Sequence, residues 1–132
     1  MKLFVCADLK NGLLFNGRRQ SRDRCLLADM LAETGGGRLW MNGYSRGQFP
    51  DAPDLWTDED PLSRAKGADG CFVENLDVTP YLAQADRLVL YRWDRVYPAD
   101  VRLTLGGEWR LLRQGTLAGH SHEIIAKEVY TK

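Results

Sequence analysis

Residues 11–49 read NGLLFNGRRQSRDRCLLADMLAETGGGRLWMNGYSRGQF. This segment begins as the end of an extended chain and continues through an arginine-rich loop into a short amphipathic helix. Three glycines then lead into an apolar strand that ends in small polar residues. Strand, helix and strand in this order are typical of a parallel sheet. Ligands bind such sheets at the carboxyl ends of the strands, so the segment predicts a ligand cleft above the sheet.

The helix is predicted from about Arg22 to Glu33, with Ser21 as its N-cap. Gly35-Gly36-Gly37 should end it, because glycine accepts the left-handed conformation that a helix C-cap requires. Phosphate-binding loops run from strand into helix, the opposite order, so these glycines are interpreted as a turn. The apolar stripe of the helix is formed by Leu27, Met30 and Leu31, with Leu26 beside them.

The rest of the chain predicts a small α/β fold with a mostly parallel sheet and an antiparallel C-terminal edge hairpin. A helix is expected over Val78–Ala85, with Pro80 in its first turn. The hairpin would pair Trp109–Thr116 with Ser121–Thr131 around Ala118-Gly119. The parallel strands are predicted at Lys2–Ala7, Arg38–Asn42, Gly70–Glu74 and Arg87–Trp93. The expected core residues are Trp40, Phe72, Val73, Leu88, Leu90, Ile125, Leu27 and Leu31.

Residues 50–69 differ from this pattern, since they are rich in aspartate, glutamate and proline. We interpret them as an exposed connection, too short for a further strand and helix with linkers, which Trp56 holds against the body.

The composition indicates one globular domain, residues 1–132, with 44% hydrophobic residues. Its 18 basic and 18 acidic residues cancel, so no global field would attract nucleic acid or a membrane. No run is long enough to span a bilayer. The three cysteines, Cys6, Cys25 and Cys71, form no CxxC pair and are expected to be buried free thiols in a reducing compartment. We therefore expect a cytoplasmic protein.

Two features of the 18–24 loop could bind a ligand. Arg18, Arg19, Arg22 and Arg24 form a basic cluster at the predicted helix N-terminus, which would suit a phosphate or carboxylate. The same arginines could instead pair with surface carboxylates. Asp23 is predicted in the first helical turn on the apolar face, where it could be a cleft acid or could only complement the helix dipole. Both alternatives stay open for each feature.

His120 and His122 are predicted on one strand, facing the same side. Two imidazoles can bind zinc, but a structural or catalytic site needs further ligands at a defined spacing, which the neighbouring sequence lacks. No metal site is therefore predicted.

Several segments together resemble the dihydrofolate reductase family over most of the chain. KLFVCADLKNGLLFN resembles that family's first strand and mobile loop, and RDRCLLADML its following helix. RLWMNGYS resembles its next strand and turn, FVENLDVTPYLAQADRLVLYRW a later glycine-containing segment, and HSHEIIAKEVY its closing strand. The resemblance implies a dihydrofolate reductase-like fold, with Asp23 near the family's pterin-binding acid and Tyr91 where a threonine partners that acid.

The chain departs from the family where the dinucleotide binds. Glu74 and Asn75 replace the paired glycines that approach the pyrophosphate, and Gly43-Tyr44-Ser45 replaces an arginine–threonine pair. The family's middle strands are expected to be missing between Phe49 and Gly70, so that the cofactor half is truncated. No cofactor is predicted.

The segment RRQSRDR also resembles short bacterial proteins that have been called ribonuclease Z. The ribonuclease Z family proper uses an HxHxDH metal motif, of which this chain has only His120 and His122. Zinc-dependent RNA processing is therefore not expected.

The resulting hypothesis is a binding module for a nucleotide-like or other small anionic ligand. Arg19 and Arg22 would hold the negative group, and polar edges would be read by Asp23, Asn42, Ser45 and Glu74. Two alternatives are a residual pterin reductase that uses NADPH, and an interaction or regulatory protein that could form a homodimer.

Overall fold

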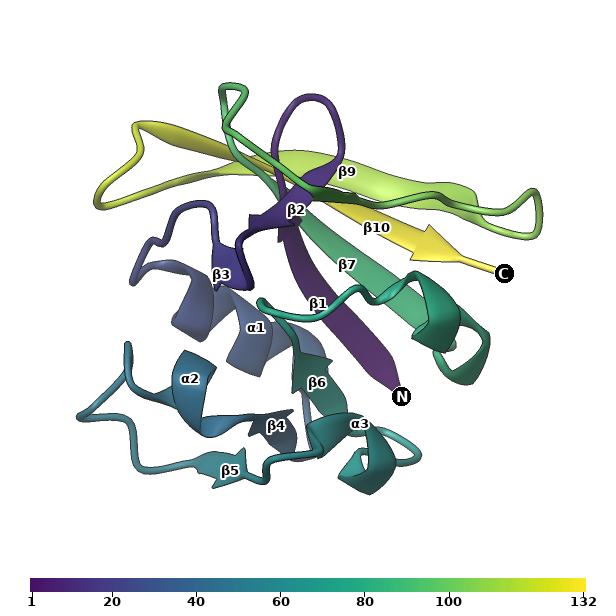
Figure 1. The fold of residues 1–132 in the computed structure, drawn as a ribbon. Coiled ribbons are helices and arrows are strands. Elements are labelled where there is room, and N and C mark those ends of the chain that lie inside the picture. The colour runs from purple at the N-terminus through teal and green to yellow at the C-terminus, as the bar shows by residue number, and fades with distance from the viewer.

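The computed structural model describes residues 1–132, and its central feature is a seven-stranded mixed sheet (Figure 1). Across the sheet the order is β5-β4-β6-β1-β7-β10-β9. The first five strands run parallel, whereas β10 and β9 add an antiparallel edge. The strands are β1 Lys2–Ala7, β4 Leu39–Met41, β5 Leu55–Thr57, β6 Gly70–Phe72, β7 Arg87–Arg92, β9 Arg110–Ala118 and β10 Ile124–Thr131.

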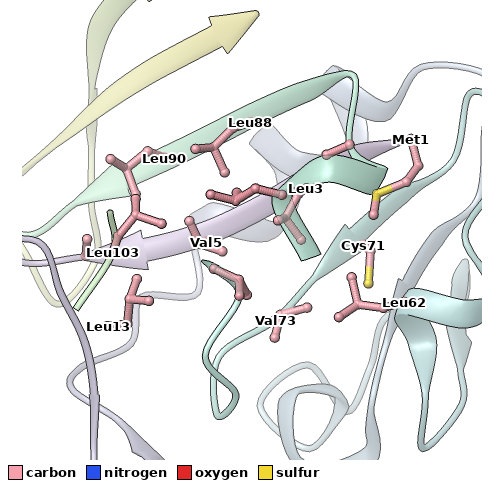
Figure 2. Packing of buried hydrophobic residues seen from close by; sticks show 14 of the residues in the cluster. Met1, Leu3, Val5, Leu13, Leu62, Cys71, Val73, Leu88, Leu90 and Leu103 are labelled. Atoms are coloured by element: carbon pink, nitrogen blue, oxygen red, sulfur yellow. The ribbon is translucent and has the colours of Figure 1, made fainter. Parts of the chain in front are cut away.

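Strand β1 lies in the middle of the sheet, and its residues alternate between two apolar layers. Leu3 and Val5 pack into one core cluster, which Figure 2 shows together with Leu88 and Leu90 of β7. Phe4 enters the other cluster. Both faces are covered, which explains why β1 reads as a continuous apolar run.

The first cluster is covered by a second, three-stranded sheet and by two short helices. That sheet consists of β2 Gly12–Phe15, β3 Arg18–Arg19 and β8 Val101–Arg102. The helices are α3 Pro61–Arg64 and the 3-10 helix η1 Thr79–Gln84. The opposite face is covered by α1 Leu26–Thr34. A further one-turn helix, α2 Gly43–Arg46, follows β4.

These elements confirm the predicted fold class. All four predicted parallel strands and the closing hairpin are present, and η1 forms where a helix with an early proline was expected. Gly35 has a φ of 68° and its N–H donates to Leu31, so the glycine run ends α1 as predicted. Of the expected core residues, Leu27 and Leu31 are only half-buried, while Leu26 and Met30 are buried.

The predicted start of the first helix was wrong. The helix begins at Leu26, and Cys25 is the N-cap residue without a capping side-chain bond, so neither Ser21 nor Asp23 belongs to it. The reason is local: the Asp23 carboxylate accepts the Cys25 N–H, and its carbonyl accepts the Leu26 N–H, which forms a turn.

The connection at residues 50–69 was also misread. It contains β5, which extends the sheet beyond β4, and the single turn of α3. Trp56 does hold β5 against the body, with its ring 5.5 Å from that of Trp40, but it remains 45% exposed. One strand therefore remains where the family resemblance implied none.

Candidate functional site

The carboxyl ends of the parallel strands meet at one edge of the sheet, as the topology requires. Glu74 follows β6, Asn42 follows β4 and Trp93 follows β7. Asp23 joins the 20–25 loop to the turn between β9 and β10, and His122 of that turn stacks on Trp93 at this edge.

Glu74 is the centre of a buried polar cluster at the end of β6. Its carboxylate accepts the Arg19 Nε–H at 3.0 Å and the Gln48 side-chain amide at 2.6 Å. The Ser45 hydroxyl is buried beside it without a well-formed hydrogen bond. Burial raises the pKa of Glu74 above its usual range, against the opposing effect of Arg19.

The Arg19 side chain makes three contacts within the protein. Besides Glu74 it donates from Nη2 to the Tyr44 carbonyl at 3.0 Å, and its guanidinium lies 4.0 Å from the centre of the Tyr44 ring. Asn42 is occupied as well, because its side chain accepts the Ser45 N–H and donates to Asn75. The structure therefore brings Arg19, Ser45 and Glu74 together with Asn42 nearby. The side chains of Arg19, Asn42 and Glu74 are hydrogen-bonded within the protein, whereas the Ser45 hydroxyl is not.

Asp23 lies elsewhere, as a fully buried carboxylate that holds the β9–β10 turn. It accepts the backbone N–H groups of His120, Ser121 and His122 at 2.8 to 3.0 Å, in addition to that of Cys25. Burial by itself would raise its pKa, but these four N–H donors outweigh it and hold the pKa well below the usual range. Asp23 is therefore ionised and saturated with protein donors.

Gly119 makes this close approach possible. A Cβ built on it would lie 2.5 Å from the nearer Asp23 carboxylate oxygen and 2.3 Å from the His122 carbonyl oxygen. Any side chain here would push the turn away from Asp23.

His122 is buried between the two segments that Asp23 joins. Its ring stacks on Trp93 with a centroid separation of 4.4 Å. Nδ1 is 3.3 Å from the Asp23 carboxylate, whereas Nε2 is 2.9 Å from the Ser21 hydroxyl and 3.4 Å from the Tyr97 hydroxyl. His120, by contrast, is exposed, and both histidines lie in the turn rather than on a strand as predicted.

A hollow of about 280 Å³ opens beside this turn and is lined only by polar residues and a glycine. We call it the polar hollow; it is formed by Arg22, Asp23, Arg24, Gly47, Gln48, His120 and Ser121. Arg22 and Arg24 are exposed and take part in none of the ion pairs of the structure. Of the four clustered arginines, only Arg19 has the carboxylate partner that a salt-bridge network requires.

A second hollow, of about 440 Å³, shares Arg24 and Gln48 with the polar hollow. We call it the apolar extension. Its remaining lining comes from Leu27, Phe49, Pro50, Asp51 and Ala52. The two hollows together form a groove with a basic end and an apolar end.

Tyr91 has a different partner from the one the family resemblance implied. Its hydroxyl donates to Asp29 in α1 at 2.5 Å, not to Asp23, and Lys127 pairs with the same carboxylate at 2.7 Å. Burial and this carboxylate raise the pKa of Tyr91 far above its usual range. Asp29 was not singled out from the sequence, because only the packing of α1 on β7 brings it to Tyr91.

Arg24 belongs to the basic cluster that the sequence indicated. Gln48, His120 and Ser121 were not predicted as lining residues, nor was His122 as the partner of Asp23. The two histidines in the predicted hairpin were the one feature of the sequence that pointed to this turn, but they were interpreted only as possible metal ligands. The structure contains no group of three His, Cys, Asp or Glu side chains that could hold a metal ion.

The fold is a dihydrofolate reductase-like α/β fold. Among solved structures, the chain is similar to dihydrofolate reductase from Enterococcus faecalis, a structure complexed with NADP(H) and RAB-propyl. The TM-score is 0.63 and the identity 10%, over 98% of this chain and 94% of the other. No protein-family model and no curated protein matches the sequence. None of the helices is long and apolar enough to cross a membrane.

Proposed function

We propose that this protein binds a small ligand with an anionic group in the groove formed by the polar hollow and its apolar extension. One observation carries the proposal: Arg22 and Arg24 face a hollow in which the only carboxylate, Asp23, already accepts four backbone N–H groups. The hollow therefore has two guanidinium groups without a protein counter-ion. A phosphate or carboxylate group of a ligand would supply this counter-ion.

The apolar extension sets the class of ligand more narrowly. Leu27, Phe49 and Pro50 offer an apolar wall next to the basic end, and Gln48 lies between the two as a hydrogen-bonding group. A planar or apolar body that carries a negative group at one end fits this arrangement, as in a nucleotide or a pterin conjugate.

The assignment of individual residues changes from the sequence hypothesis. Arg22 remains a ligand-binding residue, joined by Arg24, Gln48, His120 and Ser121. Arg19, Asn42, Ser45 and Glu74 become supporting residues that fix α2 and the 18–20 segment. The side chains of Arg19, Asn42 and Glu74 are hydrogen-bonded within the protein, and the Ser45 backbone N–H donates to Asn42. Asp23 shapes the hollow by holding the turn.

Thermal unfolding in the presence of inorganic phosphate, adenosine monophosphate and folate tests the proposal. A ligand at about 100 times its Kd stabilises the fold by about 2.7 kcal/mol, which is a clear rise in Tm. The rise should disappear in an Arg22→Ala, Arg24→Ala double variant. Arg110→Ala is the matched control, since Arg110 is exposed on β9 and lines neither hollow.

A flat response of the wild-type protein to all three probes would exclude ligands of these three types and favour the interaction-protein alternative. A shift that persists in the double variant would move the site away from the groove.

A further inference from the structure

Ser21, His122 and Asp23 form a chain of hydrogen-bonding groups, of which only Asp23 lines the polar hollow. The Ser21 Oγ is 2.9 Å from Nε2 of His122, and Nδ1 of the same ring is 3.3 Å from the Asp23 carboxylate. These are the contacts by which a histidine can take a proton from a serine while a carboxylate orients the ring.

We propose that Ser21 is an acylatable nucleophile, with His122 as its general base and Asp23 as the positioning residue, so that the protein can cleave a carboxylic ester. This proposal is independent of the anion-binding one. It depends on the three side chains themselves, and it survives if the groove binds none of the anions tested.

The surroundings of His122 support this role. Stacking on Trp93 fixes the plane of the ring, and His122 as a residue is 7% exposed, so little water competes for its nitrogens. The ionised Asp23 carboxylate can only accept a hydrogen bond, so it favours the tautomer with the proton on Nδ1, which leaves Nε2 free to accept the Ser21 proton. The Tyr97 hydroxyl, 3.4 Å from Nε2, is the one competing donor.

The position of Ser21 also gives access to a substrate. Ser21 is half-buried, and its chain neighbour Arg22 lines the polar hollow. Its other neighbour, Gln20, lines a separate hollow of about 340 Å³ that Tyr97 also lines. The backbone N–H groups of Arg22 and Asp23, directly after the serine, donate to no protein acceptor. N–H groups at and after the nucleophile are the usual donors to the oxyanion of an acyl-transfer intermediate.

The proposed ester cleavage needs no reactant other than the protein, the ester and water. Oγ of Ser21 bonds to the ester carbonyl carbon as its proton moves to Nε2 of His122, and the carbonyl oxygen takes the negative charge. Collapse breaks the ester C–O bond and releases the alcohol, which takes the proton from Nε2. Water then attacks the acyl-serine with His122 as base, which releases the carboxylic acid and restores the serine hydroxyl.

Covalent labelling of the folded, full-length protein tests this inference. With diisopropyl fluorophosphate, Oγ of Ser21 should displace fluoride, and intact-mass measurement should show one diisopropylphosphoryl group per chain. Peptide mapping should place it on Ser21. Ser21→Ala should abolish the label, whereas Ser63→Ala should keep it, because Ser63 is an exposed residue on α3.

The base is tested by the rate of labelling. His122→Gln should slow it by about 100-fold or more, the usual contribution of a positioned base. Tyr97→Phe removes the competing donor and should leave the rate equal or higher. If His122→Gln does not fold, the proposal is tested by whether the label in the wild-type protein lies on Ser21. Absence of label on Ser21 in folded protein, or an unchanged rate in folded His122→Gln, would overturn the proposal.

Discussion

The carboxylate of Asp23 accepts the backbone N–H of His120, 97 residues further along the chain, at 2.9 Å. This contact and its neighbours at Ser121 and His122 join the 20–25 loop to the turn between β9 and β10. Neither alternative considered from the sequence describes this arrangement. Asp23 is not a first-turn acid of α1, and its oxygens are engaged by the protein itself. The polar hollow exists because this junction holds its two walls together.

Asp23→Asn should lower the free energy of unfolding by about 3 kcal/mol. The amide would turn an N–H group toward N–H donors, and each hydrogen bond to a charged group contributes about 1.5–3 kcal/mol. Urea unfolding monitored by tryptophan fluorescence measures the change. Asp54→Asn, at an exposed residue without a hydrogen bond, is the control and should change stability by less than about 0.5 kcal/mol. A loss below about 1 kcal/mol for Asp23→Asn would contradict the described junction.

Asp23 and Glu74, two of the buried carboxylates, should respond to pH with opposite signs. The folded-state pKa of Asp23 is lowered, so its contribution is present above the unfolded value, about 3.9, and is lost as the pH falls below it. The folded-state pKa of Glu74 is raised, so the folded protein takes up a proton first and gains relative stability on acidification. Unfolding measured from pH 7 to pH 3 should therefore show a steeper acid loss in Glu74→Gln than in wild type. A shallower loss in that variant would show that the pKa of Glu74 is not raised.

Tyr91→Phe should cost about 1–2 kcal/mol of stability, because the Asp29 carboxylate loses one hydrogen bond but keeps Lys127. Chemical unfolding is the measurement. Tyr81→Phe is the matched control, since the Tyr81 hydroxyl makes no side-chain hydrogen bond in the structure and the substitution should be close to neutral. Equal effects of the two substitutions would argue against the contact between Tyr91 and Asp29.

NADPH should not bind to the wild-type protein. The Glu74 carboxylate occupies the position where the family resemblance implies a glycine beside the pyrophosphate, and Arg19 and Gln48 fill the space around it. Titration with NADPH should give no saturable change in tryptophan fluorescence beyond the absorbance correction. Saturable binding would revive the residual-reductase alternative.

The three cysteines should differ in their reactivity toward a thiol reagent. Cys6 and Cys71 are buried, and burial raises the pKa of Cys6 well above its usual range and that of Cys71 to about 12. Cys25 is half-buried at the start of α1. A thiol reagent should therefore modify one cysteine per folded chain, Cys25 by peptide mapping, and all three after unfolding. Modification of Cys71 in the folded protein would contradict its place in the core shown in Figure 2.

Much of the fold could be predicted from the sequence because the information was local. The apolar runs that became β1, β6 and β7 are short and continuous, and Gly35 marked the end of α1. The first turn of α1 could not be predicted in this way. The spacing from Asp23 to Leu26 and Leu27 fits a helix, yet the carboxylate satisfies N–H groups in a distant turn instead.

The candidate site was predictable only in part. The sequence indicated Arg19, Arg22 and Glu74 as candidate site residues. It could not show that Arg19 pairs with Glu74 while Arg22 has no ion-pair partner. This pairing depends on the tertiary structure, which brings the half-buried Arg19 guanidinium to the buried Glu74 carboxylate. Likewise, β5 is too short to give a periodic pattern, and only its pairing with β4 defines it as a strand.

The sequence by itself determined the α/β class, the antiparallel closing hairpin and the arginine-rich segment of the groove, since each follows from the polarity and backbone preferences of neighbouring residues. The tertiary structure alone decided which charges are paired and which are free. It also decided that Ser21, Asp23 and His122 meet, because residues about 100 positions apart come together only when the β9–β10 turn closes over the 20–25 loop.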